Sequence, residues 1–171
     1  MKGEISLRNL RIAGWIVVLT FVEAMLGTYI KIGDIMPDLL FVLVLCYAVL
    51  KNSINSTITI SAICGALADC LCGRIFGTYF AIFLLSGVLI WFIRQNIFKN
   101  SMLISIILIF AFCVLGKSMY FVANISVLKN AGYLYSLFRI ILPEAFYNTF
   151  VSALILPLVR LTLRKRSGLY R

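Results

Sequence analysis

The chain has 171 residues, of which 63% are hydrophobic and 13% are charged, and its mean hydropathy is +1.05. Soluble domains are about 45–50% apolar and about 25% charged, and a globule of this size exposes much of its surface, so the composition excludes a soluble domain and a disordered chain and points to a lipid bilayer. Sixteen basic and six acidic residues give a net charge of +10, and there is no histidine, which excludes Ser-His-Asp, Cys-His and histidine–metal chemistry.

Six apolar runs follow one another along the chain. A spanning helix needs about 20 mostly apolar residues, so the sequence predicts one transmembrane domain, an all-α bundle over residues 1–171. The first run follows a basic head, and its length and Glu23 favour a retained span over a cleaved signal peptide. Pro37 opens the second run, as suits a helix's first turn. Residues 116–118 interrupt the fifth, which is either one tilted helix or a helix with an irregular end. The predicted spans cover approximately residues 12–30, 35–50, 57–72, 79–93, 102–127 and 139–163.

Basic residues are distributed unevenly over the ends of these spans. With both termini inside, 11 basic residues face the cytoplasm and 4 face outward, while Lys117 lies at membrane depth. Cytoplasmic loops of membrane proteins concentrate Lys and Arg. The distribution therefore predicts an N-in, C-in bundle, and it accounts for the net charge better than nucleic-acid binding does.

Four ionisable side chains stand out within the predicted spans, where each costs about 2.5–3.5 kcal/mol on insertion scales; they are Glu23, Asp69, Lys117 and Glu144. Each needs a position facing protein or water. They belong either to a polar site or relay inside the bundle, or to internal pairs and interfacial positions. Glu23 and Lys117 are the deeper two, and one hypothesis pairs them with each other.

The most informative stretch covers residues 61–77. Ser61, Gly65, Asp69 and Gly73 are spaced by four, which places them on one stripe of a helix, and Gly77 continues the spacing. Small residues at this spacing let another helix approach closely. We therefore expect Asp69 to lie at a helix–helix seam, either inside the bundle or against a partner.

Two further polar clusters open predicted spans. Asp38 follows Pro37, and the simplest interpretation places its charge at the positive end of a helix. Pro143 suits a first helical turn, and Tyr147 suits an interfacial anchor. Asn148 lies one turn deeper, where its amide must find a partner in the bundle, an interaction worth about 0.6–2 kcal/mol.

The order of these motifs resembles that of the rod shape-determining protein MreD family. The resemblance rests on Pro37-Asp38 followed by aliphatic residues, on Gly65-x-x-x-Asp69-x-x-x-Gly73-x-x-x-Gly77, and on Leu142-Pro143-x-x-x-Tyr147-Asn148. The chain size, the six spans and the basic ends match as well. Where the family often has a second glycine two turns before the acid, this chain has Ser61, which is still small. Glu23 and Lys117 match no motif of the family.

The resemblance implies a non-enzymatic scaffold in the cell (inner) membrane, with a fold similar to the S component of energy-coupling-factor transporters. It implies MreC as the direct partner, and the MreB filament, RodA and a class B penicillin-binding transpeptidase as members of the same machinery, which directs lateral peptidoglycan synthesis and rod shape. The basic tail from Arg160 to Arg171 either anchors the topology or meets anionic lipid or a cytoplasmic partner.

A second hypothesis is a substrate-binding S component of a vitamin or metal transporter. Polar residues would have to converge on an outer cavity, and the candidates are Asp38, Asp69, Glu144, Tyr147 and Asn148. Such proteins couple to ATPase modules through small residues of the first helix, and this chain has no clean Ala-x-x-x-Ala there.

An enzyme is the third hypothesis. The sequence has no paired carboxylates at catalytic spacing on one helix. Its five cysteines suit small apolar positions, because the pair Cys70 and Cys72 has neither a second pair nor a histidine to complete a metal site. No cofactor is expected. Asp38 and Asp69 could still meet in space.

Overall fold

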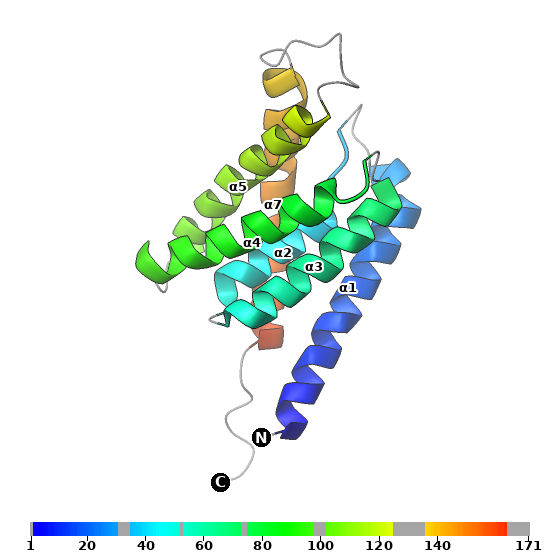
Figure 1. Cartoon of the computed structure of the whole chain (residues 1–171). Helices are drawn as coiled ribbons and strands as arrows, with labels where there is room; N and C mark the ends of the chain where they lie inside the picture. Colours follow the sequence, from blue (N-terminus) through cyan, green and yellow to red (C-terminus); the bar gives the residue numbers. More distant parts are fainter. Residues whose placement is uncertain are drawn as a thin grey trace.

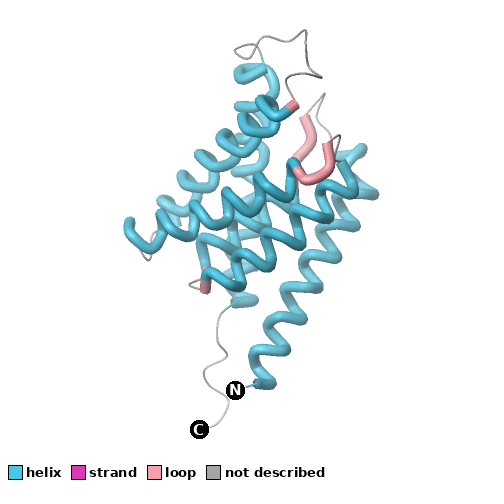
Figure 2. The backbone as a smooth tube through the Cα atoms, viewed as in Figure 1, coloured by secondary structure: helices cyan, strands magenta, loops and turns pink. Residues whose placement is uncertain are grey.

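The computed structural model describes residues 2–30, 35–51, 53–72, 75–97, 102–124 and 136–163, in part by backbone alone near helix ends. This part of the chain forms six α-helices and one π-helical turn (Figures 1 and 2). In chain order the elements are α1 (Lys2–Ile30), α2 (Leu39–Leu50), α3 (Ile54–Cys72), α4 (Thr78–Ile97), α5 (Met102–Ala123), η1 (Leu137–Ile141) and α7 (Leu142–Leu163).

The described helices have the composition and surface of a membrane protein. Four segments are long and apolar enough to cross a bilayer, namely Ile54–Leu71, Thr78–Gln95, Met102–Ala123 and Leu137–Leu163. Large apolar side chains are exposed along α1, α3, α4, α5 and α7. Since contiguous apolar surface of this extent is rare on soluble monomers, these faces are suited to lipid, and the chain is a multi-pass membrane protein.

Helix α2 is the enclosed centre of the bundle. Every residue from Leu39 to Val49 is buried, and α1, α3, α4, α5 and α7 all contact this helix. A helix that is apolar all round is suited to such a position. Its 12 residues make it shorter than the span predicted over 35–50. They rise only about 18 Å, which is less than the bilayer core of about 30 Å. Pro37 precedes the helix instead of opening its first turn, because Asp38 is the N-cap residue.

The fifth and sixth predicted spans also differ in detail from the helices. Helix α5 continues through residues 116–118 as one helix and ends at Ala123. The last helical segment begins with η1, in which the Leu142 N–H donates to the Leu137 carbonyl, five residues back. The ring of Pro143 would collide with the carbonyl four residues before it in a regular α-helix, and the wider π turn lies directly ahead of this proline.

Polar residues gather at one end of the bundle. The start of α1 and the end of α7 lie at the same end, whereas the segment before α2 and the turn before α4 lie at the opposite end (Figure 1). Asp38, Asp69 and Glu144 are all near this second end, since each is close to the beginning of α2, the end of α3 or the beginning of α7. The candidate functional site lies at this second end.

Candidate functional site

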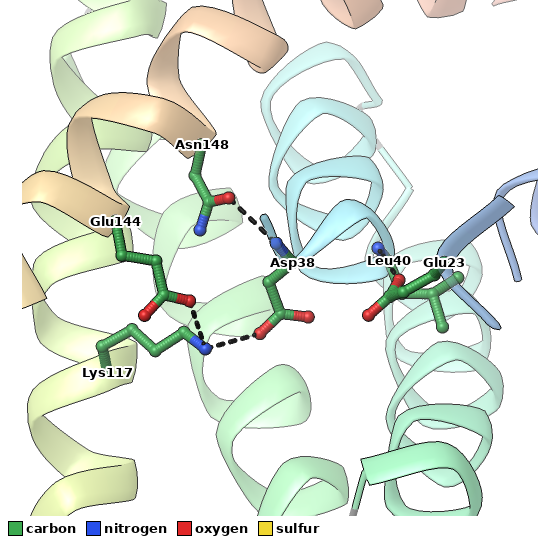
Figure 3. Close-up of polar contacts among 6 residues, drawn as sticks. All are labelled: Glu23, Asp38, Leu40, Lys117, Glu144 and Asn148. Carbon is green, nitrogen blue, oxygen red and sulfur yellow. Dashed lines mark hydrogen bonds and ion pairs between the residues drawn. The ribbon is translucent and has the colours of Figure 1, made fainter. Parts of the chain in front are cut away.

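Lys117 joins three separate parts of the bundle. Its Nζ lies 3.0 Å from Oδ2 of Asp38, at the start of α2, and 2.6 Å from Oε1 of Glu144, in the first turn of α7 (Figure 3). Lys117 itself lies on α5. A buried ammonium is tolerated when it is paired and hydrogen-bonded, and here one cation connects α2, α5 and α7.

Two tyrosine rings flank the same ammonium. The centroids of Tyr79 and Tyr120 lie 6.0 and 5.9 Å from Nζ of Lys117, at the outer limit of a cation–π contact. A cavity of about 10 Å³ lies beside them, lined by Phe41 and Gly116 among others. This is room for about one water molecule and far below the roughly 300–1,000 Å³ of a small-molecule pocket.

The beginning of α2 is capped by side chains from other helices. The Asp38 N–H donates to Oδ1 of Asn148 at 2.9 Å, and the Leu40 N–H donates to Oε2 of Glu23 at 3.1 Å (Figure 3). The first amides of a helix lack partners within it, and the positive end of the helix dipole favours a carboxylate. Glu23 of α1 and Asn148 of α7 thus supply caps that the Asp38 side chain does not make among the described residues. We call Glu23, Asp38, Lys117, Glu144 and Asn148 the charge cluster.

Asp69 caps helix α4 across the α3–α4 hairpin. Its Oδ2 accepts hydrogen bonds from the N–H groups of Gly77 and Phe80, each at 3.0 Å, and its Oδ1 accepts one from Tyr79 at 2.9 Å. Gly77, the residue before α4, has a positive φ of 94°, which favours glycine, and it has no side chain with which to cap. The carboxylate of Asp69 replaces a local cap.

The stripe that carries Asp69 faces α4. A Cβ placed on Gly65 would lie 2.7 Å from the Cα of Phe80, so the two backbones approach too closely for any side chain there. Further along the same seam, a Cβ on Gly87 would collide with the side chain of Ser61. Ser61, Gly65 and Asp69 therefore all lie on the α3–α4 seam within the bundle. Gly73 lies outside the described residues.

The remaining predicted site residues lie near the charge cluster, around the starts of α2 and α7. Pro37 is buried just ahead of α2, Pro143 is partly buried at the start of α7, and Tyr147 is partly buried one turn later. The hypothesis that pairs Glu23 with Lys117 is wrong, because the Lys117 ammonium contacts Asp38 and Glu144 while Glu23 accepts the Leu40 N–H.

Several contributing residues were not identified from the sequence. Tyr79, Tyr120 and Phe41 carry no distinctive pattern, since aromatic residues are common in apolar helices. A Cβ on Gly116 would lie 2.6 Å from the Phe41 ring, so the glycine makes room for that ring. In the sequence only its position next to Lys117 pointed to a role in the site.

The geometry does not assemble a catalytic pair from the two aspartates. Asp38 is engaged by Lys117, whereas Asp69 is engaged by three amides of the α4 terminus. Among the described residues no group of three His, Cys, Asp or Glu side chains could hold a metal ion. The charges in this part of the chain are used to join and to cap helices.

Comparisons with known proteins identify one family. A family model described as rod shape-determining protein MreD matches residues 7–166. No curated protein and no solved structure matched the chain, so the likeness to S components of transporters stays a prediction.

Proposed function

Because the chain belongs to the rod shape-determining protein MreD family, whose model covers residues 7–166, we propose that it is a non-enzymatic scaffold of the bacterial cell-elongation machinery. In this proposal it lies in the cell membrane with both termini in the cytoplasm. It binds MreC directly and works with the MreB filament, RodA and a class B penicillin-binding transpeptidase to direct lateral peptidoglycan synthesis.

Beside the family match, the proposal rests on one structural observation: the buried charged side chains contact other groups inside the bundle. Lys117 forms ion pairs with both Asp38 and Glu144, and the Asp69 carboxylate accepts hydrogen bonds from amides at the start of α4. Many large apolar side chains stay exposed on the described helices. A single-span partner can pack on such a surface within the bilayer, where helices associate through close packing.

Affinity purification of the tagged protein from its native membranes in mild detergent tests the proposal. We expect mass spectrometry to identify an MreC-like single-span protein together with cell-wall synthases. An unrelated multi-pass protein with the same tag serves as the control. Recovery of ATPase subunits with a transmembrane coupling protein would instead identify a transporter component and contradict the scaffold.

A further inference from the structure

Glu23 and Asp38 present their carboxyl groups to each other in the interior of the bundle. One oxygen of Asp38 points to Lys117 and the other points toward Glu23 (Figure 3). The two carboxyl groups face each other (Figure 3), and both residues are 6% exposed. This contact joins α1 to the start of α2.

Two carboxylates cannot meet in this way without a positive charge between them. Like charges a few ångströms apart disfavour joint ionisation, and the low dielectric of a buried site strengthens the repulsion. Lys117 does not fill the gap, because its ammonium is on the other side of Asp38, between Asp38 and Glu144. The Leu40 N–H offsets only part of the charge on Glu23.

We propose that Glu23 and Asp38 share one proton, which ties α1 to the centre of the bundle. A metal ion is the other bridge that this chemistry allows. Hard cations take about six oxygen ligands, and no group of three acidic, cysteine or histidine side chains in the described part of the chain is arranged to hold a metal. A proton needs only the two oxygens that the pair provides, as in other carboxyl pairs that share one.

The shared proton matters because α1 has few other attachments among the residues whose side chains the structure describes, 10–25. Its buried apolar stripe consists of Ile12, Ile16 and Leu19, and the Trp15 indole N–H donates to Oγ1 of Thr162 on α7 at 3.2 Å. Loss of the proton would place two negative charges in contact at the outer part of this helix. We expect α1 to separate from α2 when the proton is released.

Other ionisable groups surround the pair and belong to the same electrostatic unit. Lys117 and Cys113 approach Asp38 from α5, Glu144 approaches it from α7, and Cys64 approaches Glu23 from α3. In this proposal the folded state still holds the proton at neutral pH, whereas carboxyl groups of the unfolded chain release theirs at about pH 4. Stability therefore falls as the pH is raised through the release of this proton.

Infrared spectroscopy of the full-length protein in lipid nanodiscs tests the proposal. The chain has six acidic side chains, so the carbonyl stretch of a protonated carboxylic acid is resolved against a small background. We expect this band at neutral pH, with a shift in D₂O. It disappears in Glu23→Gln, which mimics the protonated acid, and persists in the matched control Glu144→Gln, because Glu144 contacts Lys117 and not the pair.

Thermal unfolding of the same samples supplies the second readout. The wild-type midpoint falls as the pH is raised, and the fall is smaller in Glu23→Gln. Absence of the band at neutral pH overturns the proposal. A midpoint that rises in sodium or potassium chloride relative to choline chloride, with no band, would identify a bound cation instead. A band that survives Glu23→Gln would place the proton elsewhere and also overturn it.

Discussion

Asp69 shows how a single acidic residue can stabilise a hairpin within a membrane through backbone amides. Its two oxygens accept the N–H groups of Gly77, Tyr79 and Phe80. All three donors lie where helix α4 has no partners of its own. These contacts of Asp69 are internal to the bundle.

We predict that Asp69→Ala lowers the free energy of unfolding by about 3 kcal/mol, because hydrogen bonds to a charged group contribute about 1.5–3 kcal/mol each and two of the three are only partly buried. Asp69→Asn is expected to be intermediate, since one amide oxygen still accepts. Thermal unfolding in mild detergent measures the order. Cys70→Ala, at the exposed neighbouring position, is the control, and an unchanged midpoint in Asp69→Ala would refute the capping role.

Removal of the Lys117 charge leaves two buried carboxyl groups without their cation. We predict that Lys117→Met costs about 3–5 kcal/mol, as is typical for one partner of a buried ion pair. Addition of Asp38→Asn and Glu144→Gln to the same chain should recover part of this loss, because the acids no longer need a counter-charge. The same unfolding assay distinguishes the variants. A triple variant no more stable than the single one would argue against the ion pairs.

Sequence reasoning at this scale identified the residues that need partners but not the partners themselves. Glu23, Lys117 and Glu144 stand out because ionisable groups are costly in apolar helices. The observed contacts join residues that are far apart in the chain, and neither spacing nor composition determines which acid reaches Lys117. The wrong Glu23–Lys117 pairing has this cause.

Elements were more predictable where the spacing of small residues is regular. The four-residue repeat of Ser61, Gly65 and Asp69 predicts a close seam, and α3 and α4 form that seam. The wholly apolar sequence of α2 indicates that this helix is enclosed, but it does not show which helices surround it. The π turn of η1 could not be placed, because a proline alone does not determine how a helix accommodates it.

The seam predicts opposite effects for two glycines. Gly65→Ala should lower stability by about 1–3 kcal/mol, the usual cost of overpacking, because the added Cβ meets the backbone of Phe80, which cannot rotate away. Gly14→Ala is the matched control, since its Cβ would meet nothing within 4 Å, and it should be neutral or stabilising by up to about 1 kcal/mol through helix propensity. Equal midpoints for the two variants would contradict this packing.

At the scale of the whole molecule, the polar end of the bundle is the end predicted to face away from the cytoplasm. Single cysteines at Ser53 and at Phe76, in a chain with Cys70→Ala and Cys72→Ala, report on the two ends, because both positions are exposed in turns. An impermeant maleimide should label Phe76→Cys in intact cells and Ser53→Cys only after permeabilisation. The reverse pattern would invert the predicted topology.

We propose that the buried polar residues hold the bundle together, and that the elongation machinery uses the fold itself. The most direct test measures cell shape and the amount of folded protein together, in rod-shaped cells that depend on this chain, for Asp69→Ala and Lys117→Met. We predict that loss of rod shape follows the loss of folded protein, and that variants restored to the wild-type folded level restore rods. Round cells at a wild-type level of folded variant would contradict the claim and assign these charges a direct contact with a partner.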